Sequence, residues 1–151
     1  MAGSIQVQRA ERTIRAPLKF AYDWCTDFRE DDHEITGETR RREIVEKTRR
    51  KVVYVYYWND ETGKQNMSVS IVSLKPPDAW RLDLFSKEEN ETGNYKLTRL
   101  GKNETKLRMV FKHDWKVEQN IPPVAEREER FVRRWDKYIE ALESDYRKQA
   151  S

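Results

Sequence analysis

The segment AEREERFVRRWDKYIEALESDYRK, residues 125–148, decides the fold, because it carries the clearest periodic pattern in the chain. Its large apolar residues recur every three or four positions, which places them on one face of an α-helix: Phe131, Trp135, Tyr138, Ile139, Leu142 and Tyr146. Pro122 and Pro123 predict that the helix begins after them, and Arg147 and Lys148 suit its C-terminal end. A helix of about 35 Å needs a broad apolar surface to lie on.

The middle of the chain, from about Glu38 to His113, has the two-residue period of β-strands. The predicted strands are residues 38–48, 51–58, 66–75, 79–87, 93–100 and 104–113. Residues that favour turns separate them: Arg49-Arg50, residues 59–63, Pro76-Pro77-Asp78, Glu89 to Thr92, and residues 101–103. Six strands with such short links predict an antiparallel meander, apolar on one face and solvated on the other.

The first 37 residues predict a strand followed by a short helix. Residues 5–15 are compatible with a strand, and Ala16-Pro17 ends it. Pro17 suits the first turn of a helix over residues 18–28. The polar run after it, ending at Gly37, is interpreted as a loop or a frayed helix end. The order strand, helix, six strands, long helix predicts an α+β fold, with a curved antiparallel sheet of about seven strands around the C-terminal helix.

This order resembles the START-like superfamily, also called SRPBCC, helix-grip or Bet v 1-like, which includes the polyketide cyclase/dehydrase and lipid-transport proteins. The resembling features are the opening RTIRAPLKFAYDWCTDF (residues 12–28), the polar run REDDHEITG (29–37), the meander and the amphipathic C-terminal helix. The resemblance covers nearly the whole chain. It implies a helix-grip fold with an apolar cavity between sheet and long helix, occupied by a lipid, a polyketide or another hydrophobic small molecule.

Size and composition agree with a single domain, residues 1–151, with a core of large rings. Charged residues make up 38% of the chain, yet the net charge is only +3, so no strong field of one sign is expected. The lone Cys25 excludes an internal disulfide. Without a signal sequence or a membrane span, we expect a cytoplasmic protein, a monomer or homodimer, with no cofactor. Few Gly and abundant Lys, Arg and Glu are also typical of a thermophilic source.

The residues expected to line the cavity share the inward phase of their strands or of the helix. Any one of these rings could simply fill the core, but buried Tyr and Trp polar tips need partners, which a ligand could supply. They are Trp80, Leu82, Tyr95, Leu97, Met109, Phe111, His113, Phe131, Trp135 and Tyr138. Such pockets typically enclose roughly 300–1,000 Å³.

Three polar features each have a functional and a simpler interpretation. His113 continues the inward face of strand 104–113 and could act as an acid or base, but a histidine at the solvent rim is the simpler reading. Asp31-Asp32-His33-Glu34 matches no metal motif and is interpreted as a solvated loop at the cavity mouth. The basic runs Arg40-Arg41-Arg42 and Arg49-Arg50-Lys51 are diluted by glutamates, which favours solvated strand ends over a nucleic-acid site.

Three functions remain open. The first is binding or transport of a hydrophobic, ring-bearing molecule without covalent chemistry. The second is a cyclase or dehydratase acting on a polyketide-like substrate, with His113, Tyr95 and Tyr138 as candidate catalytic residues. The third is a co-chaperone-like interaction module that uses the outer face of strand 51–58, although the apolar residues on both faces leave its inward phase open. Cys25 is expected to be a buried structural thiol rather than a nucleophile.

Overall fold

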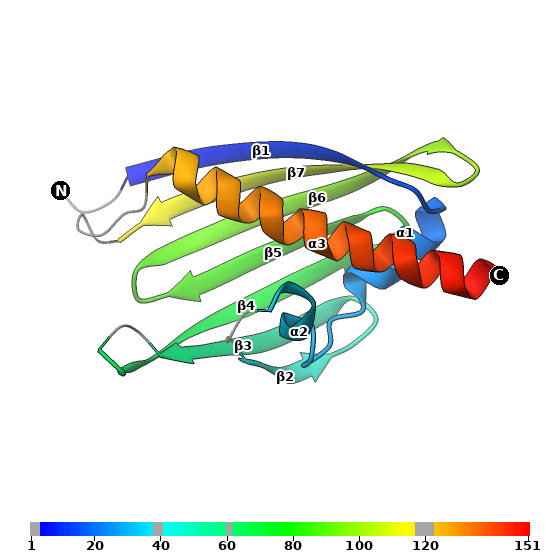
Figure 1. Cartoon of the computed structure of the whole chain (residues 1–151). Helices are drawn as coiled ribbons and strands as arrows, with labels where there is room; N and C mark the ends of the chain where they lie inside the picture. The colour runs from blue at the N-terminus through cyan, green and yellow to red at the C-terminus, as the bar shows by residue number, and fades with distance from the viewer. Residues whose placement is uncertain (1–3, 38–40, 60–61, 117–122) are drawn as a thin grey trace.

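A computed structural model describes residues 4–37, 41–59, 62–116 and 123–151. Its elements follow the predicted order: a strand, short helical segments, a meander of strands and a long C-terminal helix (Figure 1). The predicted strand residues 38–40, the turn residues 60–61 and Pro122 lie outside the described residues. Within the described part of the chain, no helix is long and apolar enough to cross a membrane.

The strands form one antiparallel sheet, seven-stranded within the described residues, in the order β1-β7-β6-β5-β4-β3-β2. Each strand of the meander pairs with the next, and β1 closes the order by pairing with β7 from Ser4↔Trp115 to Ile14↔Thr105. The strands are β1 Ser4–Ile14, β2 Arg41–Lys47, β3 Lys51–Asn59, β4 Gln65–Lys75, β5 Ala79–Ser86, β6 Glu89–Gly101 and β7 Glu104–Trp115. The predicted α+β helix-grip architecture is confirmed.

One predicted turn is wrong. Glu89 to Thr92 belong to β6, so the link from β5 is only two residues long. Asparagine, and threonine more weakly, favour turns locally, but Thr92 pairs with Asp83 on one side and with Lys112 on the other. Pairing along both edges overrides the weak local preference. This difference matters, because the first residues of β6 bring two carboxylates onto the concave face.

The first short helix lies at one end of the sheet, and the second lies in front of its β2–β3 side (Figure 1). Helix α1, Leu18–Thr26, begins after Pro17 as predicted and ends two residues before the predicted limit. Thr105 donates from Oγ1 to the Ala16 carbonyl oxygen at 2.8 Å, which fixes the step from β1 into α1. The polar run contains a four-residue helix, α2 His33–Thr36, and Gly37 ends it with a φ of 72° that glycine adopts without strain.

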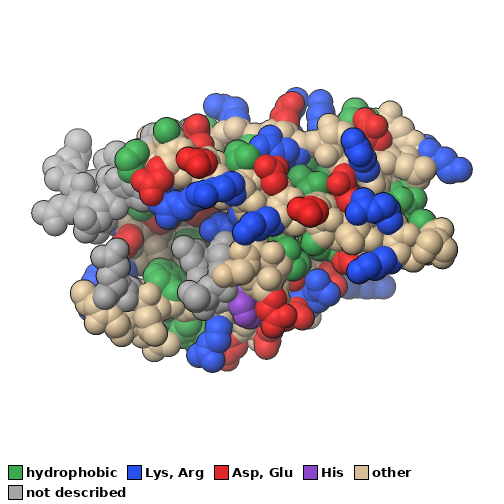
Figure 2. Space-filling view, viewed as in Figure 1, with side chains coloured by type: hydrophobic (Ala, Val, Ile, Leu, Met, Phe, Trp, Pro, Cys, Tyr) green, Lys and Arg blue, Asp and Glu red, His purple; other side chains and the backbone are tan. Residues whose placement is uncertain are grey.

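Helix α3, Val124–Ala150, crosses the concave face of the sheet (Figure 1). Its apolar stripe packs inward as predicted, with Leu142 fully buried and Ile139 7% exposed. Polar contacts hold its middle and its C-terminal part: Arg12 to Asp136 at 2.9 Å, and Trp24 Nε1 to Asp145 at 2.9 Å. Charges of both signs cover its outer surface (Figure 2).

The structure also settles which face of β3 points inward. Val52, Tyr54 and Tyr56 belong to the core or pack against it. Because side chains alternate along a strand, Val53, Val55 and Tyr57 lie on the convex face.

Candidate functional site

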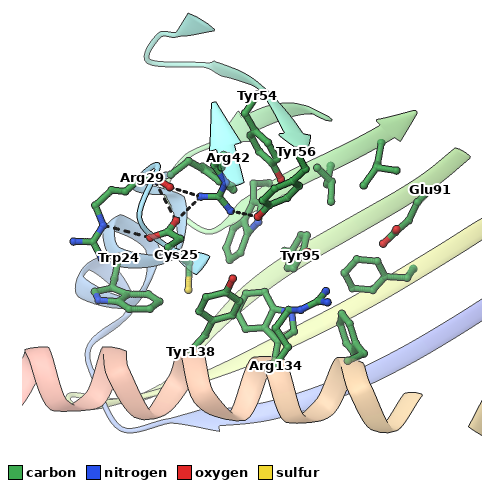
Figure 3. A pocket seen from close by; sticks show the side chains of 18 residues that line it. Trp24, Cys25, Arg29, Arg42, Tyr54, Tyr56, Glu91, Tyr95, Arg134 and Tyr138 are labelled. Atoms are coloured by element: carbon green, nitrogen blue, oxygen red, sulfur yellow. Dashed lines mark hydrogen bonds and ion pairs between the residues drawn. The ribbon is translucent and has the colours of Figure 1, made fainter. Parts of the chain in front are cut away.

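A pocket lies between the concave face of the sheet and the helices (Figure 3). Its volume is about 160 Å³, smaller than the sequence led us to expect, because large rings occupy much of the space. Side chains from α1, α3 and five strands converge on it. The lining residues are Trp24, Cys25, Phe28, Arg29, Asp32, Arg42, Tyr54, Tyr56, Trp80, Leu82, Leu84, Glu91, Tyr95, Phe111, Phe131, Arg134, Trp135 and Tyr138.

Most of the predicted cavity residues line this pocket: Trp80, Leu82, Tyr95, Phe111, Phe131, Trp135 and Tyr138. Leu97 and Met109 do not, because they are fully buried in the packed core. His113 is buried next to the pocket-lining Phe111, at 8% exposure, so the interpretation of a solvent-rim histidine is wrong.

The apolar wall of the pocket is a connected set of rings. Trp80 stacks on Tyr95 with ring centroids 4.7 Å apart and planes 10° from parallel. Tyr95 also meets Phe111 at 5.3 Å and Trp135 at 5.6 Å, and Phe111 meets Phe131 at 4.5 Å. Edge-to-face and offset pairs of this kind favour fixed positions. The wall therefore presents ring faces and edges to an occupant.

Gly93 allows Phe111 to lie over β6 in this wall. A Cβ at position 93 would lie 2.7 Å from Cε1 of Phe111, closer than carbon atoms approach. The two residues face each other across the β6–β7 pair. Glycine at this position thus sets the place of one pocket-lining ring.

Arg42 dominates one end of the pocket. It donates from Nη1 to the Asp32 carboxylate and to the Arg29 carbonyl oxygen at 2.9 Å, and from Nη2 to the Tyr56 hydroxyl oxygen at 2.6 Å (Figure 3). Its guanidinium also lies over the ring of Tyr54, 4.6 Å from the centroid. The side chain is well buried for a cation, at 6% exposure.

Burial by itself would lower the pKa of Arg42, but its neighbours Tyr56, Tyr54 and Asp32 outweigh that effect and raise it. Arg42 therefore stays charged. The interpretation of this basic run as a solvated strand end is wrong for Arg42, and that of the acidic run as a solvated loop is wrong for Asp32. One feature of the sequence indicates that Arg42 points inward. Arg42 and Ile44 are two residues apart, so they lie on the same face of β2, and Ile44 packs against the core.

A second polar cluster lies toward the opposite end. His113 Nδ1 is 2.8 Å from Glu89 Oε2 and 3.9 Å from Glu91 Oε2, and Glu91 lines the pocket. One ligand atom from each of the three lies within 4.8 Å of the others, close enough for a metal ion. A cation, Arg127, lies near this cluster. Burial lowers the pKa of Arg127, and the nearby carboxylates of Glu89 and Glu91 raise it. Glu89 and Glu91 are each an even number of residues from Tyr95, so all three lie on the same face of β6. The sequence does not indicate this while residues 89–92 are predicted to form a turn.

One thiol and three phenols of the wall are neutral at ordinary pH. Burial raises the pKa of the Cys25 thiol to about 12, which agrees with a structural thiol although it lines the pocket. Burial also raises the pKa of Tyr54, Tyr95 and Tyr138 above the usual value for phenols. Their hydroxyl groups therefore keep their protons and can donate hydrogen bonds.

The folded chain is similar to several solved structures. The Zhui aromatase/cyclase from Streptomyces sp. R1128 superposes with a TM-score of 0.65 at 18% identity, over 98% of this chain and 97% of the other. Ara h 8.0201 gives 0.69 at 13% identity, over 95% and 98%. A START superfamily protein from Mycobacterium smegmatis gives 0.61 at 14% identity, over 95% and 98%. The chain has the START-like, helix-grip fold.

These likenesses extend over nearly the full length of both chains, so the whole architecture is shared. At such low identities they establish the fold alone. No family model and no curated protein sequence matches the chain. The function must therefore be argued from the pocket itself.

Proposed function

We propose that this protein binds a hydrophobic small molecule in the pocket between sheet and helix α3. The observation that carries the proposal is the connected wall of rings around a pocket of about 160 Å³. Apolar concave sites with a few polar groups are the usual form of small-molecule sites. Fold neighbours that include an aromatase/cyclase and a START superfamily protein are compatible with this proposal.

The size of the pocket limits the ligand. An apolar cavity of about 150 Å³ accommodates benzene. The pocket as built thus suits one aromatic ring with small substituents. A polyketide or a long lipid would require the rings of Trp135 or Tyr138 to move outward with α3.

Native mass spectrometry tests the proposal. The purified protein is measured intact and after denaturation with organic extraction, beside a Leu82→Trp variant that fills the pocket and a Val45→Trp variant that adds the same ring at a position 63% exposed. We expect a released small molecule, or binding of added ethylbenzene, with the wild type and Val45→Trp but not with Leu82→Trp. Equal binding by both variants would contradict the proposal. Thermal unfolding confirms that each variant is folded.

A second candidate function, proton transfer to or from a bound molecule, is favoured by the Glu89–His113–Glu91 cluster. Glu91 lines the pocket, and the His113 imidazole lies within 4 Å of both carboxylates. We propose that the Glu91 carboxylate can accept a proton from the ligand, while the neighbouring His113 and Glu89 compensate the change of charge at Glu91. Tyr95 and Tyr138, candidates from the sequence, line the same pocket and would act as hydrogen-bond donors there.

A probe that needs only a base tests this activity. In 5-nitrobenzisoxazole a base removes the ring C–H proton, the N–O bond breaks, and a coloured cyanophenolate forms. We expect the wild type to accelerate this reaction over acetate at equal concentration, and Glu91→Gln to lose the acceleration. Glu88→Gln, on the exposed link before β6, is the matched control and should retain it. A Glu91→Gln rate equal to that of the wild type would exclude the role.

A further inference from the structure

We propose that Glu89, Glu91 and His113 bind a divalent transition-metal ion of the zinc class at one end of the pocket. The inference goes beyond the binding of a hydrophobic molecule, because it assigns a different kind of ligand. One ligand atom from each of the three residues lies within 4.8 Å of the others. Among the residues that the structure describes, this is the one group of three histidine, cysteine or acidic side chains that meets the condition.

The pairing of β6 with β7 brings the three side chains together. Glu91 faces His113 in the register, and Glu89 lies two residues earlier on the same face of β6. His113 Nδ1 is 2.8 Å from Glu89 Oε2 and 3.9 Å from Glu91 Oε2. Ligand atoms bound at about 2.1 Å, at octahedral or tetrahedral angles, lie about 3.0–3.4 Å apart. Side-chain rotation alone would therefore bring the three ligand atoms onto one ion.

The cluster is more buried than an ordinary group of surface acids. The side chains of Glu89, Glu91 and His113 are 19%, 17% and 10% exposed. Two carboxylates on one face of a strand repel each other, and more strongly where water is partly excluded. The single hydrogen that His113 Nδ1 can carry serves one carboxylate well, that of Glu89. A metal ion would bind both carboxylates and the imidazole at once.

Two arginines of α3 also act near the cluster. Burial lowers the pKa of Arg127 by more than Glu89 and Glu91 raise it, so the pKa lies below its ordinary value. In a tight ion pair with these carboxylates the pKa would be raised instead. Arg134 and Glu91 both act on the pKa of the buried Tyr95 hydroxyl, in opposite directions. The arginines therefore reduce the attraction for a dication, but they come from the helix and not from the two strands that hold the ligand atoms.

The set of donor atoms selects the class of metal. One imidazole nitrogen and two carboxylate oxygens suit zinc, which takes three protein ligands in sites that keep a position open. Calcium and magnesium prefer six or more oxygen ligands. Because Glu91 lines the pocket, the open position would face its interior. His113 Nε2 makes no hydrogen bond in the described structure, so the second-nitrogen contact that usually supports a metal-bound histidine is missing. We therefore expect micromolar rather than nanomolar affinity.

Calorimetric titration of zinc chloride into the chelator-treated and dialysed protein tests the inference. The chain has two histidines, so His33→Ala is the matched control for His113→Ala. Glu91→Gln keeps the shape of the side chain but removes the carboxylate, and Glu88→Gln on the exposed link is its control. We expect one ion per chain with the wild type and both controls, and at least tenfold weaker binding with His113→Ala and Glu91→Gln. Thermal unfolding confirms that the isosteric Glu91→Gln is folded.

Three results would overturn the inference. The first is the lack of both a binding heat and a rise in melting temperature at about 1 mM zinc. The second is equal zinc affinity of the wild type and Glu91→Gln, or a loss confined to His33→Ala, which would place the ion elsewhere. The third is manganese that binds more tightly than zinc, because a site that uses an imidazole nitrogen favours zinc.

The same titration keeps this inference apart from the proposed functions. Ethylbenzene binding depends on the wall of rings and not on the ion. A bound ion would occupy the Glu91 carboxylate, which the second candidate function uses as a base. Zinc should therefore suppress the reaction of 5-nitrobenzisoxazole with the same concentration dependence as the calorimetric binding. If the metal-free protein shows no such reaction, the proton-transfer proposal fails, while the calorimetric result still decides the metal site.

Discussion

Replacing Asp32 by asparagine should destabilise the folded protein by about 2–3 kcal/mol. Asp32 is the anionic partner of Arg42, whose side chain is only 6% exposed. Removing one partner of a buried ion pair costs roughly 3–5 kcal/mol, because the other charge stays buried without compensation. Asparagine keeps an oxygen that can accept one hydrogen bond, and Arg42 retains the Arg29 carbonyl and the Tyr56 hydroxyl. These remaining contacts reduce the expected cost to just below that range.

Urea unfolding followed by tryptophan fluorescence measures the change, with Asp31→Asn as the matched control. Asp31 is 63% exposed and pairs only loosely with Arg29, at 3.8 Å, so its loss should change the stability by less than about 0.5 kcal/mol. The double variant Asp32→Asn with Arg42→Met should recover part of the loss, because it removes the buried charge itself. Equal stabilities of Asp32→Asn and Asp31→Asn would refute the buried pair as a stabilising contact.

Three further predictions follow from the packing and the titratable groups. Gly93→Ala should cost about 1–3 kcal/mol in urea unfolding, because the new methyl group would collide with the Phe111 ring, whereas Gly101→Ala meets nothing closer than 4.0 Å and should change little. Burial raises the pKa of Tyr54 and Tyr95, so the folded protein keeps both phenols protonated at a pH where the unfolded chain loses the protons. Their contribution to the free energy of unfolding is therefore complete below about pH 10 and is lost as the pH rises above it. The melting temperature should therefore fall between pH 10 and 12, and tyrosinate absorbance from these residues that precedes unfolding would contradict this. Because the thiol pKa of Cys25 rises from 9.0 to about 12, a disulfide reagent at pH 7 should react about a thousandfold more slowly with the native protein than with the protein in urea.

The elements that could be predicted from the sequence are those whose periodicity agrees with their packing. The face of α3 that carries Phe131, Trp135 and Leu142 packs as its spacing indicates. The strand that carries Leu107, Met109 and Phe111 points the same residues inward, because alternation is fixed by backbone geometry. The inward phase of β3 could not be predicted, since both of its faces are apolar.

The polar residues of the pocket could not be predicted from the sequence, for a different reason. Arg42 and Asp32 each resemble surface residues in their local context, and only the folded chain brings them together across ten positions. The sequence predicts a turn at Glu91 because its neighbours favour turns, but β6 pairs with a strand on each side and extends through this residue. The pocket volume depends on how rings such as Trp80 and Tyr95 stack, which residue spacing does not reveal. The role of these residues in binding stays a prediction.

The central claim, that the interior pocket binds a ring-bearing ligand, is tested most directly by nuclear Overhauser effects from bound ethylbenzene to the labelled protein. We predict contacts from the ligand ring protons to the side chains of Trp80, Tyr95 and Trp135, which line the pocket. Contacts only to Met67 and Phe85, which are 49% and 46% exposed, would show surface adsorption and contradict the claim. So would the lack of any contact at saturating ligand.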